Sequence, residues 1–223
     1  LTDGEEGRFV ASSIFETKIK NQYKNKDFVI LYRTNAQSRA FEDSLRKKNI
    51  PYRVYGGLSF YQRKEIKDIL AYLRLIVNNS DEEAFKRIIN FPPRGIGQTS
   101  VDKLIVESKE SKTTVYDVAK NIDKINVNIS PKIKSKISDF VLLVEKTKLM
   151  LTESDAFEIT EEVIRSSGVY KLYKDEETLE SISRMQNIEE LLNGVKDFVD
   201  FQSNNTQLKP TIEEFLQDVA LVT

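Results

Sequence analysis

The chain has 223 residues, a formal net charge of -1 and no Cys, His or Trp. Without Cys or His it has no thiol nucleophile, imidazole base or disulfide, and nearly all zinc chemistry is excluded. Because no apolar run reaches the roughly 18 residues of a membrane helix, we expect a cytoplasmic protein with no membrane partner.

The first 55 residues alternate between helical and strand-like patterns. Apolar residues at helical spacing predict a helix within 5–23. The apolar run 27–33, rich in β-branched and aromatic residues, predicts a buried strand of a parallel sheet, and 51–55 predicts a second one. A helix over about 35–48 is expected between them. Because two strands cannot form an independent sheet, we expect the other strands to lie outside this sequence, in a longer protein.

The remaining residues show helical patterns only. A long helix is predicted through Ile66–Ile76, followed by a helix start at which Ser80 and Glu83 match a capping box. We place a domain boundary here, between residues 1–77 and residues 78–223. Further helices are expected at 81–90, 99–109, 114–121, 131–151, 155–166, 178–201 and 211–221. The predicted fold class is mixed α/β and predominantly helical, with a partial α/β unit of few parallel strands before an all-α unit.

Charge is unevenly divided along the chain. Residues 33–74 hold ten basic and four acidic residues, a net of +6, whereas residues 104–223 hold 15 basic and 22 acidic residues, a net of -7. A basic block beside an acidic one suggests a single region that faces a polyanion. On charge alone, chance clustering on solvated helix faces is the better explanation. Adjacent carboxylates such as Glu161 and Glu162 do not share a helix face, so we interpret them as solvated surface.

The segment Leu31–Arg39 connects the end of the first predicted strand to a helix, and Thr34 with Gln37 matches a capping box there. Ligands of open α/β sheets bind at this edge of the sheet. Tyr32 offers a flat face to a nucleobase, and Arg33 offers a charged fork suited to phosphate. The alternative is a tyrosine at the edge of the core with an arginine on its rim. The residues alone favour that alternative.

A second segment, Gly56–Asp68, combines aromatic side chains with Arg63, Lys64 and Lys67. Aromatic stacking beside basic groups is how proteins hold single-stranded nucleic acid without sequence preference. An amphipathic helix with a charged outer face explains the pattern equally well.

A third segment contains Arg94 and the turn from Gly95 to Gly97, before a helix that Thr99 is expected to cap with Asp102 at the box position. Glycine allows a close backbone approach, and the N–H groups of a helix start attract anions. Such a hairpin of helices grips duplex phosphate without reading sequence. A plain tight turn is the alternative, and the combination of arginine with two glycines favours the functional interpretation.

These motifs, in this order and at these spacings, carry a family resemblance. The matching residues are Tyr32–Arg39, Ile50–Tyr52, Gly56–Arg74, Ile89–Asn90 and Arg94–Gly97, with weaker matches at Ser166–Tyr170, Arg184 and Asn187–Glu190. They resemble the UvrD/PcrA/Rep group of superfamily 1 DNA helicases, densely over residues 27–103 and by pattern only over 104–223. The resemblance implies a partial second RecA-like motor domain (2A-like) over 1–77, followed by its helical insertion (2B-like) over 78–223.

The resemblance also implies the chemistry of the parent protein, an ATP-dependent 3′-to-5′ DNA helicase that moves along single-stranded DNA and unwinds duplex DNA in repair or replication. Tyr32 would stack on adenine, and Arg33 would act catalytically by reaching the terminal phosphate. The residues assigned to DNA are Arg63, Lys64, Lys67, Arg94, Gly95, Gly97 and Thr99, of which the first three could equally serve the hinge to the insertion. No residue is assigned to a metal.

The sequence contains no Gly-x-x-x-x-Gly-Lys-Ser/Thr loop, so ATP and Mg²⁺ are expected in the full-length protein and neither in this chain alone. The chain alone is therefore expected to be inactive. Expected partners are single-stranded DNA, junctions of single- and double-stranded DNA, the rest of the helicase chain, and repair or replication proteins. Alternatively, the acidic helical unit is mainly a regulatory or protein-docking module, because an acidic surface binds phosphate poorly. A relative fused to a nuclease also fits.

Overall fold

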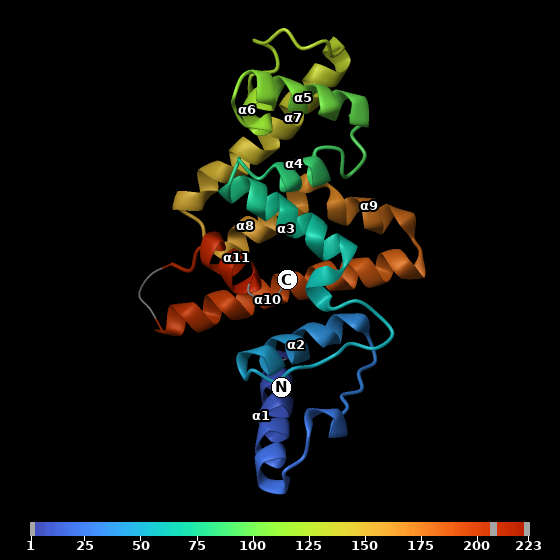
Figure 1. Ribbon diagram of the computed structural model, residues 1–223, viewed down its shortest axis with the longest axis vertical. Helices are drawn as coiled ribbons and strands as arrows, with labels where there is room; N and C mark the ends of the chain where they lie inside the picture. Colours follow the sequence, from blue (N-terminus) through green and yellow to red (C-terminus); the bar gives the residue numbers. More distant parts are fainter. Residues whose placement is uncertain (1–2, 206–208, 221–223) are drawn as a thin grey trace.

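The computed structural model describes residues 3–205 and 209–220, which form helices and short 3-10 turns but no strand. The helices are stacked in tiers (Figure 1), with α1 (Asp3–Asn21) and α2 (Ser38–Lys47) at one end of the molecule. The long helix α10 (Leu179–Asn205) crosses the middle. No described helix combines the length and the apolar character that a membrane span requires.

The other helices pack together beyond α2. They are α3 (Lys64–Val77), α4 (Glu82–Ile88), α5 (Gln98–Glu110), α6 (Val115–Lys120), α7 (Pro131–Lys148), α8 (Ala156–Ser167), α9 (Val169–Glu176) and α11 (Ile212–Ala220). The 3-10 turns are η1 (Asn25–Asp27), η2 (Asn35–Gln37), η3 (Phe60–Gln62) and η4 (Leu149–Thr152). The predominantly helical class is confirmed, and the predicted helices match these bounds within a few residues. The end of the last one, at residue 221, lies outside the described residues.

The strands predicted at 27–33 and 51–55 are wrong for this chain, and with them the α/β part of the predicted fold class. Both segments are extended, but neither pairs into a ladder among the described residues. Side chains expected in a sheet core are exposed instead, Val29 by 80%, Leu31 by 87% and Tyr55 by 83%. A strand needs a neighbouring edge to receive its backbone hydrogen bonds, and the described residues offer none.

Helix α9 was not predicted. Helix α8 ends at Gly168, whose φ of 81° lies in the left-handed region, and α9 begins with the next residue. The sequence predicts no helix between 155–166 and 178–201, because α9 has only eight residues, too few to display a periodic pattern.

The capping predictions have mixed outcomes. Gln37 accepts a hydrogen bond from the backbone of Thr34, as predicted, and the predicted helix begins there as the 3-10 turn η2 before α2. Asp81 rather than Ser80 caps α4, accepting from the backbone N–H of Ala84 at 2.9 Å. The N-cap of α5 is Gly97, which places Thr99 inside the first turn. Each of the two errors moves a helix start by one or two residues.

Buried apolar side chains form two clusters. The larger runs from Phe60 to Val219 and includes α3, in which Tyr72 is completely buried. Burying a large apolar side chain contributes about 1.5–3 kcal/mol relative to leaving it exposed, so α3 is a main source of stability. The smaller cluster, Ala11, Leu45 and Ile50, lies between α1 and α2. Helix α3 therefore packs with the helical bundle, although the predicted unit 1–77 includes it. The domain boundary between residues 77 and 78 stays a prediction.

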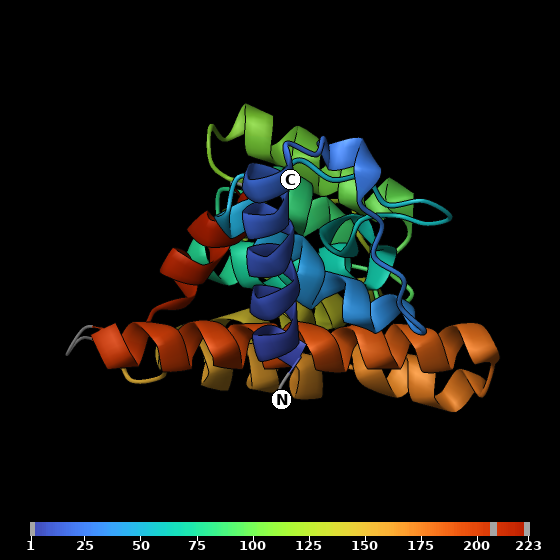
Figure 2. The same ribbon diagram turned by 90° about the horizontal axis from the view of Figure 1, so that it is seen from below.

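Helix α10 contacts both clusters. It packs against α3, α8 and α9 of the bundle, and also against η2 and α2. Seen from below (Figure 2), α10 spans the molecule and the N-terminal end of α1 lies next to it. Helix α10 is therefore one connection between the N-terminal helices and the bundle, and another is η3, which contacts α2.

Candidate functional site

The backbone at Arg33 is held in place by a side chain of the following turn. Gln37 Oε1 accepts hydrogen bonds from the backbone N–H of Arg33 at 2.9 Å and of Thr34 at 3.1 Å. The side chain of Arg33 is exposed and forms no ion pair with any residue that the structure describes. A guanidinium with a fixed backbone and no internal partner is available to a phosphate.

Tyr32 is half-buried, and its ring stacks on Phe41 of α2 with centroids 6.4 Å apart and 21° between the ring planes. It lines a cavity of 650 Å³ between α1, α2 and the two extended segments. The cavity also contacts Phe28, Ile30 and Tyr52, but not Arg33. The apolar lining of this cavity is typical of the space between a sheet and the helices that cover it, rather than of a site for a triphosphate.

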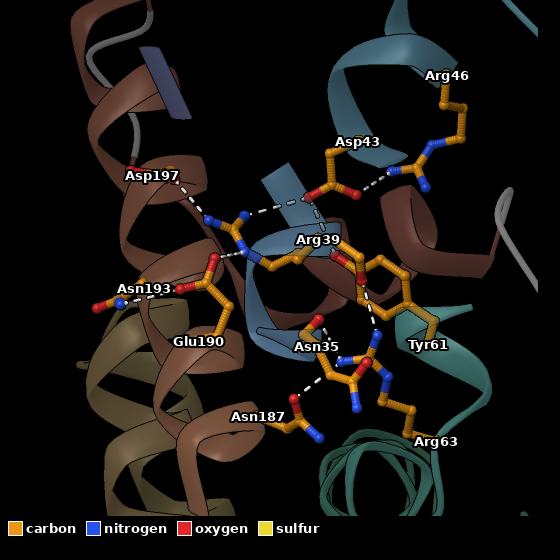
Figure 3. A network of polar contacts seen from close by, with 11 residues as sticks. Asn35, Arg39, Asp43, Arg46, Tyr61, Arg63, Asn187, Glu190, Asn193 and Asp197 are labelled. Carbon is orange, nitrogen blue, oxygen red and sulfur yellow. Dashed lines mark hydrogen bonds and ion pairs between the residues drawn. The ribbon is translucent and has the colours of Figure 1, made fainter. Parts of the chain in front are cut away.

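Arg63 is enclosed, with 8% of its surface exposed, and joins two separate parts of the chain. Its Nη1 donates to the backbone oxygen of Asn35 and to Oδ1 of Asn187, each at 2.8 Å, and Nη2 donates to Oγ of Ser38 at 2.7 Å. Figure 3 shows this guanidinium between the turn after Arg33 and helix α10. Burial lowers the pKa of Arg63 from its ordinary value. The group lies inside the fold rather than on a surface that DNA could contact.

Arg39 of α2 forms a second network of hydrogen bonds with the same helix α10 (Figure 3). Its Nε donates to Glu190 at 2.6 Å, Nη1 to Asp43 at 3.2 Å, and Nη2 to Asp197 at 3.1 Å. Burial opposes the charge, but Glu190 and Asp43 more than compensate and raise the pKa of Arg39 above its ordinary value. A Cβ on Gly194 would lie 2.7 Å from Nη1 of Arg39, so the close approach depends on this glycine.

Both arginines meet one face of α10, because Asn187, Glu190 and Asp197 are three and seven residues apart. The sequence predicted neither network. The signal that could have found them is the weak family match at Asn187–Glu190. That match drew attention to these residues, but it did not indicate that they bind Arg63 and Arg39.

Lys64 and Lys67, the other cations of the second motif, lie on the outside of α3. Lys64 is exposed, with Nζ 5.2 Å from the ring centroid of Phe91, just before the third motif. Lys67 is partly exposed. Unlike Arg63, these side chains are accessible to a ligand.

Arg94 supports the third motif from within. Its Nη1 donates to the backbone oxygens of Ile88 and Phe91, each at 2.9 Å, and Nη2 donates to Tyr72 Oη at 2.6 Å and to the backbone oxygen of Ser167 at 3.3 Å. These bonds add a charged donor to carbonyls at and just beyond the end of α4, where Ile88 also accepts the N–H of Phe91 and Phe91 also accepts the hydroxyl of Tyr72. The guanidinium therefore faces the fold.

The turn itself is open to solvent. Gly95, Gly97 and Thr99 are exposed, and Gly95 has a φ of 74°. Lys136 of α7 lies against the turn, because a Cβ on Gly95 would be 2.6 Å from its Nζ. The structure thus adds a cation to this motif that the sequence did not identify. Across the described residues, no three acidic side chains converge as a metal site would require.

Comparison with known proteins identifies the family of the chain. The family described as UvrD-like helicase C-terminal domain matches residues 2–223. ATP-dependent DNA helicase PcrA of Staphylococcus aureus is 37% identical over 222 residues, covering 100% of this chain and 30% of that protein. PcrA of Bacillus subtilis is 37% identical over 217 residues, 97% of this chain and 28% of that protein. This chain spans about 30% of the length of the curated relatives it matches.

Proposed function

Because the chain belongs to the UvrD-like helicase C-terminal domain family, we propose that it supplies one side of an ATP cleft and a DNA-contacting helical unit to an ATP-dependent helicase. The whole protein uses ATP with Mg²⁺, moves 3′-to-5′ along single-stranded DNA, and unwinds duplex DNA at junctions in repair or replication. The chain alone does not turn over ATP. The relatives are named ATP-dependent DNA helicases, which supports the activity of the whole protein.

The observation that carries this proposal is the exposed, unpaired Arg33 on a backbone that Gln37 holds in place. An arginine that reaches a terminal phosphate across a cleft stabilises the charge that develops in phosphoryl transfer. Tyr32 beside it contributes a ring for the adenine. In this proposal the chain supplies contacts to the nucleotide, and Mg²⁺ is held by the rest of the whole protein.

Replacing Arg33 in the full-length protein tests the ATP role. R33A should keep nucleotide binding and lose about 10³-fold or more of its ATP turnover, the typical effect of removing such an arginine. R53A, which removes an exposed arginine on the other extended segment, is the matched control and should keep turnover. Unchanged ATP turnover in R33A would refute the role assigned to Arg33. Substantial ATP turnover by the isolated chain would refute the proposal that this chain supplies only one side of the ATP cleft.

For the DNA contact, we propose that the exposed turn from Gly95 to Gly97, with Thr99, lies against duplex phosphate. Lys136 supplies the positive charge at this turn, because Arg94 is occupied internally. Lys64 and Lys67 face DNA from α3. The test is a titration of the chain with duplex DNA at several salt concentrations. K136Q should reduce the slope of log K against log salt by about 0.9, the value for one phosphate contact.

The alternative, a regulatory or protein-docking module, is favoured by the net charge of -7 over residues 104–223. The same titration separates the two functions. Duplex binding with a steep salt dependence that K136Q weakens supports phosphate gripping. No duplex binding at low salt supports docking of a repair or replication protein.

The exposed apolar residues of the extended segments point to the rest of the helicase chain as a partner. Val29 and Leu31 alternate with the partly buried Phe28, Ile30 and Tyr32 in the way that a sheet strand requires. On the other segment, exposed Tyr55 follows the partly buried Val54. We propose that 27–33 and 51–55 become strands when the rest of a RecA-like sheet pairs with them.

A further inference from the structure

A continuous series of hydrogen bonds runs from the backbone of Arg33 to helix α10. Gln37 holds the N–H of Arg33 and belongs to η2. The first carbonyl of η2, from Asn35, accepts from Arg63, as does the hydroxyl of Ser38 that follows the turn. Arg63 then donates to Asn187 on α10. One guanidinium therefore contacts both the turn after Arg33 and the helix that supports the bundle.

The part of this connection around Arg63 is buried, which makes it rigid. Ser38 is 1% exposed and Asn187 is 3% exposed. The amide of Asn187 is held in turn, since Nδ2 donates to Glu65 Oε1 at 2.6 Å. Hydrogen bonds to a charged group in a buried site are strong, and an acceptor left without its donor there is costly. The Arg33 turn cannot move relative to α10 without breaking these bonds.

The shape of arginine suits this position. Its planar fork presents donors on two nitrogens in fixed directions, whereas lysine has a single rotating ammonium. Here Nη1 divides its donors between the turn and α10, and Nη2 holds the turn alone. A lysine could keep the charge but could not reach all three acceptors at once.

We propose that Arg63 is a positioning residue, which fixes where Arg33 can reach and ties that position to α10 and the helical bundle. This inference rests on the nucleotide role proposed for Arg33. Events at the terminal phosphate then reach the bundle through the turn, Arg63 and Asn187. Arg63 touches neither nucleotide nor DNA in this role.

The test removes two sets of hydrogen bonds of Arg63 in the full-length helicase. We call them the arm to the turn, formed with Asn35 and Ser38, and the arm to α10, formed with Asn187. S38A weakens the arm to the turn, and R63K weakens both arms. Each should lower kcat for ATP turnover, R63K by about 10–100-fold, because small misplacements of a catalytic group have effects of this size. KM for ATP should stay within about twofold, since the base contact of Tyr32 is untouched. N187A leaves the arm to the turn intact and removes the arm to α10, together with the hydrogen bond from Asn187 to Glu65.

N187A should therefore keep kcat within about threefold of wild type but lower the base pairs unwound per ATP by about fivefold or more, as expected for lost coupling between sites. N187Q, which keeps the amide but displaces it, is a second variant in case N187A folds poorly. The matched control is S44A, a buried serine on α2 outside this network, which should leave both readouts unchanged.

Three results would overturn the proposal. If R63K and N187A lower only the unfolding temperature, with kcat and unwinding per ATP unchanged in the folded protein, Arg63 is a structural residue. If R33A keeps full turnover while R63K loses it, the nucleotide role of Arg33 fails and the inference fails with it. Loss of turnover in R33A with a normal R63K refutes the inference alone.

Discussion

Arg39, Arg63 and Arg94 each direct a guanidinium inward, where its donors meet oxygens from separate segments. Transferring a charged group from water to the interior is costly unless its hydrogen bonds are satisfied, and all three groups make several. Each arginine therefore fixes the relative position of the segments it joins. In this chain arginine serves as an internal connector at least as much as a ligand for phosphate.

Gly194 allows Arg39 its close approach to α10. An alanine in mid-helix normally gains about 0.5–1 kcal/mol over glycine, but here its Cβ would lie 2.7 Å from Nη1 and 3.0 Å from Cζ of Arg39. That side chain is held by Glu190, Asp43 and Asp197 and cannot move away freely. We expect G194A to lower the free energy of unfolding by about 1–3 kcal/mol, the usual cost of overpacking.

Urea unfolding of the isolated chain followed by circular dichroism measures this change. The control is G57A, because a Cβ on Gly57 would meet nothing within 4 Å and should change stability by no more than about 0.5 kcal/mol. A stabilised G194A would mean that Arg39 relaxes without losing its partners.

Arg94 is predicted to matter for stability even without DNA. R94A removes a charged donor from the carbonyls of Ile88, Phe91 and Ser167. The Ile88 carbonyl keeps the N–H of Phe91 and the Phe91 carbonyl keeps the hydroxyl of Tyr72, but Ser167 loses its donor, and an unsatisfied group of this kind costs about 1–3 kcal/mol. Thermal unfolding of the isolated chain checks this. R74A, which removes a half-exposed arginine paired with Asp81, should cost no more than about 1 kcal/mol. Equal stability of R94A and wild type would show that the turn holds without Arg94.

At the scale of helices, α10 joins the N-terminal helices to the bundle through charges that differ in burial. The Glu190 side chain is 6% exposed and that of Asp197 is 47% exposed, although both pair with Arg39. Removing one partner of a buried ion pair leaves an uncompensated charge, whereas an exposed pair is screened by solvent.

We therefore expect E190A to destabilise the chain by about 3–5 kcal/mol and D197A by no more than about 1 kcal/mol. Chemical denaturation of both variants at one salt concentration makes the comparison, with D197A serving as the control for E190A. Similar losses in the two variants would show that burial does not determine the strength of this network.

The helices could be predicted from the sequence because their pattern is local. The stripe through Ile66–Ile76 appears within a few turns, and α3 follows it. The strand at 27–33 could not be judged in this way, since a strand depends on partners distant in sequence or outside it. For the candidate site, the sequence motifs identified Arg63 and Arg94 as candidates. They did not show that the side chains of both residues point into the fold. That direction depends on Asn187 and Ser167, which are distant in sequence.

The molecule as a whole combines a large helical core with a small and incomplete N-terminal one. The small cluster contains Ala11, Leu45 and Ile50, while the apolar residues of the extended segments stay exposed. A region with few buried contacts and few backbone hydrogen bonds opens easily. We therefore expect the bundle to be stable on its own, and the N-terminal part to become more stable when the rest of the proposed sheet covers it.

Hydrogen exchange tests this dependence and the proposed strands together. In the isolated chain the backbone N–H groups of 29–32 and 52–55 donate no hydrogen bond to another described backbone group, so they should exchange nearly as fast as an unfolded peptide. In the full-length helicase the same amides should become protected by at least about tenfold, because pairing into a sheet gives each alternate N–H an acceptor. Amides of the buried residues of α3, such as Ile69 and Leu73, are the internal control and should be protected in both proteins. Fast exchange of both segments in the full-length protein would refute the proposed sheet. Slow exchange in the isolated chain would mean that the segments find another partner, such as a second copy.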